Sequence, residues 1–140
     1  MDHSEIETKL EGINTTLTIR QIAPAVVLLK ISGSDYGELG TAPFHVLEKV
    51  LREGPFSLFI DARATKGASV DVSNVWAQWL RKHRDDLVRI HMLTASRYVQ
   101  LTADFVRRFA DLGDAMLIYT DPRVFDETLE GAAHRRKEIP

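Results

Sequence analysis

Cysteine is absent from the 140 residues of this chain, which excludes disulfide bonds and thiolate chemistry. Long hydrophobic runs are absent too, so no segment reads as a bilayer-spanning helix and we expect no integral membrane protein. The first residues, MDHSEIETKLEG, are polar and acidic, unlike a signal peptide, and we expect a cytoplasmic location. The net charge of -2 offers no attraction for nucleic acid, which we do not expect as a partner.

Catalytic and metal-binding motifs are also lacking. The five histidines are scattered, without the pairs at i and i+4 or the cysteine partners typical of metal sites. Ser96 has no G-x-S-x-G motif around it, and the loop SGSDYGELG lacks the lysine of a phosphate-binding loop. Asp61 is followed two positions later by Arg63, where a phosphatase of the haloacid dehalogenase type has a second aspartate; arginine does not shuttle protons at neutral pH. We therefore expect no metal, no cofactor and no catalytic role.

The composition that remains is that of one ordinary globular domain. Hydrophobic residues make up 44% of the chain and charged residues 27%, and no repeat or long linker divides it. We predict a polar N-terminal segment over residues 1–14, a single α/β domain over 15–133 and a short C-terminal tail over 134–140.

The hydrophobic pattern predicts the element order ββαβαβαβα. Alternation around Leu17 and the apolar run 25–31 indicate an antiparallel hairpin at the start. Strands at 56–60, 90–93 and 115–119 then alternate with helices, one of which spaces four apolar residues as a single face: Leu101, Phe105, Phe109 and Leu112. Right-handed crossovers make the later strands parallel, so we predict a mixed, mostly parallel sheet packed by helices.

Polar residues follow the strands at the edge where a parallel sheet usually forms its site. Asp61 and Arg63 come after one predicted strand, and Ser96 and Arg97 come after the next. Loops after the carboxyl ends of parallel strands gather at one edge, so these four residues form a candidate sheet-edge site. An enzyme using Asp61, Arg63 and Ser96 is one alternative; plain solvation of surface loops is the other.

The segment FSLFIDARATKGASVDVSNVW, residues 56–76, resembles the strand, loop and helix start of STAS domains, the anti-sigma-factor-antagonist-like family of sporulation switches. In that family an Asp-Ser-Ser-Gly-like motif opens the helix. Here VDVSN puts Asp71 at the motif's aspartate and Ser73 at the serine that family kinases phosphorylate, while Val72 and Asn74 replace the first serine and the glycine. The resemblance in element order covers most of the chain, and the motif covers only these few residues.

The resemblance implies a STAS-like fold and a noncatalytic regulatory module that binds another protein, a kinase-like partner or another regulator. Its docking surface would be the segment 68–74, which includes Ser69, Asp71 and Ser73, together with the following helix. A phosphate on Ser73 in the first helical turn would be stabilised by backbone N–H groups and the helix dipole. In the alternative, Asp71 or Ser73 is only the helix N-cap.

Two tryptophans lie three positions apart on one predicted helix face. Trp76 and Trp79 either pack in the core or line a pocket, together with Phe105 and Phe109, for a small apolar ligand or lipid. CRAL-TRIO lipid-binding domains share some overall similarity with this element order. A homodimer through an exposed helix is compatible with the pattern, although nothing in it requires one.

Overall fold

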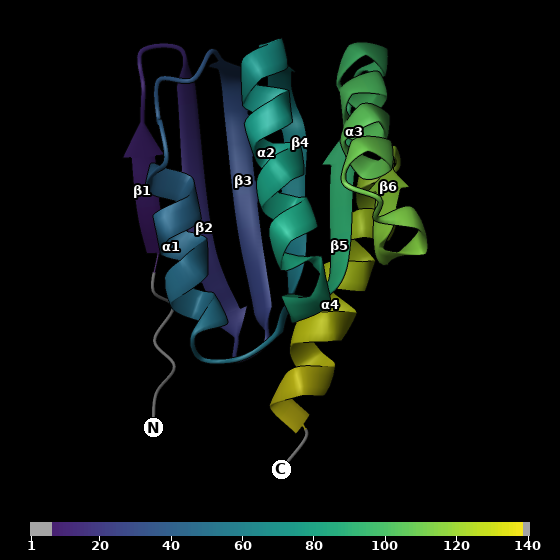
Figure 1. Ribbon diagram of the computed structural model, residues 1–140. Coiled ribbons are helices and arrows are strands. Elements are labelled where there is room, and N and C mark those ends of the chain that lie inside the picture. The colour runs from purple at the N-terminus through teal and green to yellow at the C-terminus, as the bar shows by residue number, and fades with distance from the viewer. Residues whose placement is uncertain (1–6, 139–140) are drawn as a thin grey trace.

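The computed structural model describes residues 7–138, which form a six-stranded sheet with helices on both faces (Figure 1). The strands lie side by side in sequence order: β1 (Glu7–Glu11), β2 (Thr15–Ala23), β3 (Val26–Asp35), β4 (Phe56–Ala68), β5 (Leu87–Thr94) and β6 (Met116–Tyr119). The helices are α1 (Ala42–Leu51), α2 (Val70–His83), α3 (Arg97–Phe109) and α4 (Pro122–Glu138), with short 3-10 turns at Arg84–Asp86 and Gly113–Ala115. None of the helices within residues 7–138 is both long and apolar enough to cross a membrane.

The sheet is mixed and mostly parallel, as predicted. β1, β2 and β3 pair antiparallel, whereas β3, β4, β5 and β6 pair parallel. Each parallel pair is joined by a helical crossover, which is the connection that parallel strands require. The fold class inferred from the sequence is therefore confirmed.

The structure has one strand more than the sequence pattern predicted. β1 lies inside the segment 1–14, which was expected to be a polar N-terminal extension, and Leu10 packs against the core. Its exposed positions carry Glu7, Lys9 and Glu11, so the strand reads as polar although it pairs along β2. Charged side chains of this kind protect an edge strand from pairing with other chains.

The C-terminal boundary also differs from the prediction. α4 continues to Glu138, so most of the expected tail 134–140 is helical. Residues 1–6 and 139–140 of the two predicted end segments lie outside the described residues.

Two apolar layers hold the fold together. The larger one lies between the sheet and α1, α2 and α3, and the smaller one lies between the sheet and α4 (Figure 1). Strand alternation produces the two layers: Leu58 and Ile60 of β4 face the three-helix side, and Phe59 between them faces α4, where it meets Phe125. Phe59, Phe125 and Leu58 are completely buried.

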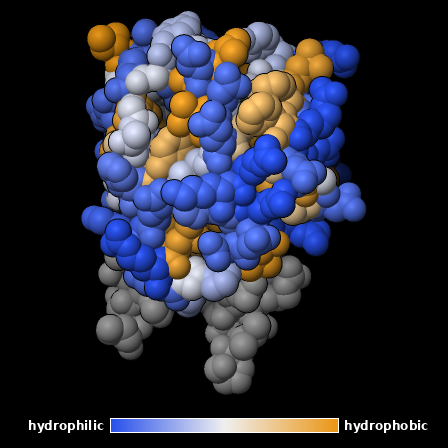
Figure 2. Space-filling view, viewed as in Figure 1, coloured by the Kyte–Doolittle hydropathy of each residue, from blue (hydrophilic) through white to orange (hydrophobic). Residues whose placement is uncertain are grey.

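α3 turns a different face to the sheet than the spacing of its large residues suggested. Leu101, Phe105 and Phe109 are 57%, 39% and 43% exposed, and only Leu112 of that predicted face is buried. The buried side of α3 carries smaller residues, namely Val99, Ala103 and Val106. Figure 2 shows apolar side chains exposed among hydrophilic ones on the face that carries α1, α2 and α3. The helix therefore has two apolar stripes, and the stripe of smaller side chains lies against the domain.

Candidate functional site

The candidate site is built where α2 begins. β4 runs alongside β3 as far as the pair Asp35 and Ala68, and Ser69 then opens α2. Ser69 is the N-cap: its hydroxyl accepts a hydrogen bond from the backbone N–H of Val72 at 3.2 Å, and its own N–H donates to the Asp35 carbonyl at 2.9 Å. The end of β3 and the first turn of α2 are thereby tied together.

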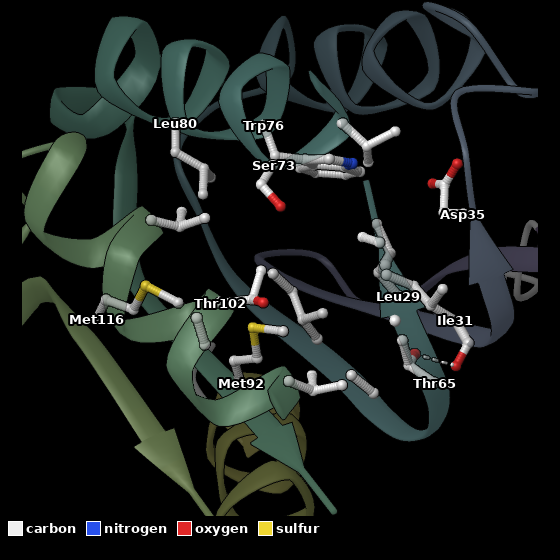
Figure 3. A pocket seen from close by; sticks show the side chains of 18 residues that line it. Leu29, Ile31, Asp35, Thr65, Ser73, Trp76, Leu80, Met92, Thr102 and Met116 are labelled. Atoms are coloured by element: carbon white, nitrogen blue, oxygen red, sulfur yellow. Dashed lines mark hydrogen bonds between the residues drawn. The ribbon is translucent and has the colours of Figure 1, made fainter. Parts of the chain in front are cut away.

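A partly open cavity of about 80 Å³ lies between α2, α3 and the sheet (Figure 3). The sheet, α2 and α3 supply its apolar walls, which include Leu29, Ile31, Ile60, Met92, Val72, Trp76, Leu80, Val99, Ala103 and Val106. Concave apolar surfaces that hold a few polar groups are the usual form of small-molecule sites.

Three hydroxyl groups line this cavity, and all three already donate to backbone carbonyls. Thr65 donates to the Ile31 carbonyl at 2.9 Å, a bond drawn in Figure 3. Ser73 donates to the Ser69 carbonyl at 3.1 Å, and Thr102 donates to Tyr98, also at 3.1 Å. Each hydroxyl has one hydrogen to donate, so none of the three has a donor left for a ligand. The cavity therefore suits apolar groups.

Among the residues that the structure describes, Asp35 is the one charged residue that lines the cavity. Its side chain lies at the end of β3, at one side of the cavity (Figure 3), and the residue is only 7% exposed. Its Oδ1 accepts a hydrogen bond from the N–H of Gly37 at 2.9 Å, where the left-handed backbone of the glycine (φ 96°) turns the chain toward α1. Asp35 also lines a shallower groove between the β3–α1 loop and α2.

The two tryptophans have different surroundings. Trp76 is half-buried, lines the cavity and packs edge-on against Phe44, with ring centroids 4.7 Å apart. Trp79 is buried in the core and its Nε1 donates to the Glu48 carboxylate at 2.9 Å. That hydrogen bond, assisted by the nearby charges of His83 and Lys82, holds the pKa of Glu48 below its usual value. Of the pair, Trp76 is a wall of the cavity and Trp79 is a core residue.

Ser73 does not lie on the surface. It is 8% exposed, lines the cavity and donates to the carbonyl one turn earlier. Asp71 is exposed, and Ser69 is half-buried. The expectation that Asp71 or Ser73 caps the helix is wrong, because Ser69 stands at the last extended position before the first turn. A kinase would reach Ser73 only if the start of α2 opened.

The residues predicted at the sheet edge fall into two separate groups. Arg63 forms ion pairs with Asp61 and with Asp126 of α4: its Nε lies 3.0 and 3.1 Å from the Asp61 oxygens, and its Nη2 donates to Asp126. These hydrogen bonds raise the pKa of Arg63 further above its already high value, so the guanidinium stays charged. The ion pair borders an open groove of about 570 Å³ beside α4, on the sheet face opposite the apolar cavity.

Ser96 and Arg97 belong to the start of α3. Ser96 is its N-cap, since its hydroxyl accepts from the N–H of Val99 at 3.1 Å, and Arg97 is exposed. Between residues 7 and 138 no hydrogen bond or ion pair joins either residue to Asp61 or Arg63. The structure does not assemble the four residues into one site.

Sequence reasoning missed the residues that shape the cavity most. Asp35 was predicted to lie in the loop SGSDYGELG, yet it ends a ten-residue strand. The stripe Val99, Ala103 and Val106 was overlooked beside the larger apolar residues of the same helix. Its helical spacing of four and three was the signal that would have found it.

The architecture defines the class of this protein: a single α/β domain of STAS-like, or SpoIIAA-like, fold. No family model matches the sequence, and no curated protein matches it. The fold is shared with an uncharacterized protein from the DUF3478 family with a SpoIIAA-like fold from Shewanella loihica PV-4, with a TM-score of 0.57 and 14% identity over 92% of this chain and 96% of that one. It is shared as well with an anti-sigma factor antagonist from Mycobacterium paratuberculosis, with a TM-score of 0.53 and 12% identity over 91% of this chain and 95% of that one. At these identities the likeness concerns the fold alone.

Proposed function

We propose that this chain is a noncatalytic regulatory module that binds a small apolar molecule in the cavity between α2 and α3. The observation that carries the proposal is the apolar cavity wall, whose three hydroxyl groups already donate hydrogen bonds to backbone carbonyls. An apolar group entering such a site leaves none of these three hydroxyl donors unsatisfied. Each methylene that moves from water into it contributes about 0.8 kcal/mol.

Filling the cavity from the protein side tests this proposal. Ala103 is 1% exposed and lines the cavity, so Ala103→Leu places extra carbon atoms inside it. We expect 1-hexanol to perturb the amide resonances of cavity residues in the wild-type protein, and its affinity to fall at least about tenfold in the variant, a loss of about 1.4 kcal/mol. An NMR titration of the labelled full-length chain measures both.

The matched control is Leu101→Ala, on the exposed side of the same helix, which should bind 1-hexanol as the wild type does. If Ala103→Leu does not fold, Val99→Leu fills the same cavity from the preceding turn. Unchanged hexanol binding in the filled variant would contradict the proposed site.

A second candidate function is protein docking on the outer side of α2, with a kinase-like protein or another regulator as partner. In its favour, Val70 and Val75 are 72% and 44% exposed beside the exposed Asp71. The structural likeness to an anti-sigma factor antagonist adds support. We place this activity in the cytoplasm, and we propose that phosphorylation of Ser73 weakens docking by forcing the start of α2 open.

Mass spectrometry of the native and then the denatured protein tests the switch. A phosphate-sized adduct that survives denaturation and maps to Ser73 supports it, whereas an adduct only on other serines contradicts it.

Two glutamate variants test the docking surface. Val75→Glu on α2 should abolish binding of a partner that the wild type retains. Val124→Glu on α4 is the control and should keep that partner, because the two valines are similarly exposed.

A further inference from the structure

Asp35 lies at one side of the apolar cavity, and its negative charge restricts which ligands the cavity can bind. Of the described residues that line the cavity, Asp35 is the single ionisable one, and none is a lysine, arginine or histidine. Buried carboxylates are normally paired with a cation or with several hydrogen-bond donors, because removing a charge from water is costly. Asp35 is 7% exposed, and among the described residues its second carboxylate oxygen has no hydrogen-bond donor.

Within the part of the chain that the structure describes, Asp35 has only a backbone partner for its side chain. Gly37 N–H donates to Oδ1 at 2.9 Å, and no lysine, arginine or histidine forms an ion pair with the carboxylate. A carboxylate has about four acceptor positions, so most of its acceptor capacity remains. The first turn of α2 lies close by, as the bond from Ser69 N–H to the Asp35 carbonyl shows, but it carries only partial positive charge.

We infer that the ligand of this cavity is an amphipathic cation, with an aliphatic or aromatic group between α2 and α3 and an ammonium group bound to Asp35. The inference rests on the proposed function, since it names the ligand class of the same cavity. The ammonium donates to the free oxygen of Asp35 and supplies the counter-charge that the described residues do not. A fatty acid fits poorly, because its carboxylate would meet Asp35 with no basic residue in the cavity wall.

Trp76 adds to this selection. Trp76 and Asp35 both line the cavity and also the adjoining groove. Figure 3 shows the Trp76 ring and Asp35 on the same side of the cavity. An aromatic face beside a carboxylate is a favourable setting for an organic cation.

Three probes of equal chain length test the inference: hexylamine, 1-hexanol and hexanoate, each titrated by NMR into the full-length protein near neutral pH, where the amine is cationic and the acid anionic. We expect the amine to bind at least about tenfold tighter than hexanoate, which corresponds to about 1.4 kcal/mol. In Asp35→Asn, whose amide oxygen still accepts from Gly37, the two affinities should agree within about twofold.

Asp71→Asn is the matched control, because Asp71 is an exposed carboxylate that lines the neighbouring groove and not the cavity. It should leave the preference for the amine intact. An equal loss of preference in Asp71→Asn would overturn the assignment to Asp35 and indicate a general surface field. Hexanol binding without any preference for the amine in the wild type would overturn the inference alone, whereas no shift with any probe would overturn the proposed function with it.

Discussion

At the residue scale, His91 shows how burial sets the behaviour of a titratable side chain. It lies on the α4 side of β5, 7% exposed, with its ring stacked on Phe59 at a centroid distance of 4.1 Å. Its Nδ1 is 2.8 Å from the Tyr119 hydroxyl. Burial in this apolar layer, with a smaller contribution from the charge of Arg89, lowers the pKa of His91 to about 4.

This histidine makes the stability of the fold depend on pH. Between pH 6.5, where an unperturbed histidine titrates, and about 4, the unfolded chain binds a proton that folded His91 does not. The free energy of unfolding should therefore fall as pH decreases through this window, by roughly 1 to 3 kcal/mol. Urea denaturation at a series of pH values measures the slope.

His91→Gln provides the control, because glutamine fills a similar volume and does not titrate. The variant should lose most of the slope that the wild type shows between pH 6.5 and about 4. The same slope in both proteins would show that folding does not lower the pKa of His91.

At the element scale, the start of α2 depends on Ser69 more than on Ser73. The Ser69 hydroxyl accepts from an N–H of the first turn, whereas the Ser73 hydroxyl donates to the Ser69 carbonyl one turn earlier. α3 repeats the arrangement, with Ser96 as its N-cap. Ser69, predicted in the docking segment, and Ser96, predicted at the sheet edge, thus both have a structural role as helix N-caps.

Removing the two α2 hydroxyls separately tests this division. Ser69→Ala should lower the free energy of unfolding by about 1 kcal/mol and speed amide exchange in the first turn of α2. Ser73→Ala should cost about 0.5 kcal/mol or less, because alanine is a better helix former and no cap is lost. Chemical denaturation and hydrogen exchange measure the two effects, and a larger cost for Ser73→Ala would reverse the assignment.

At the scale of the whole molecule, the buried Phe125 anchors α4 to the sheet, whereas the phenylalanines of α3 are partly exposed to solvent. Phe125 is completely buried between Phe59 and Tyr119, with ring centroids 5.8 and 5.6 Å away. Phe105 is 39% exposed and touches Phe109, which is itself 43% exposed. Removing the Phe125 side chain should therefore lower the free energy of unfolding far more than removing the Phe105 side chain.

Phe125→Ala should lower the free energy of unfolding by about 3 to 5 kcal/mol, because it leaves a cavity in the smaller apolar layer. Phe105→Ala should cost less than about 1 kcal/mol. Thermal and urea unfolding of both variants make the comparison. A large cost for Phe105→Ala that grows with protein concentration would show that a second copy covers this side of α3 in solution.

Much of this fold could be read from the chain itself. Alternation around Leu17, short apolar runs such as 56–60 and turn residues such as Pro122 predict the order of most elements, because these signals act over a few neighbouring residues. The sequence pattern did not predict β1, because an edge strand needs apolar residues on only one of its sides, and Leu10 alone is a weak signal.

The site was decided by tertiary structure. Periodicity shows that α3 has apolar residues, but packing determined that Ala103 meets the cavity while Phe105 faces outward. Asp61 and Arg63 were visible in the sequence, yet their partner Asp126 lies 63 positions after Arg63. Local sequence determines how each segment folds; the neighbours of a side chain depend on which segments the sheet brings together, and that is a property of the whole chain.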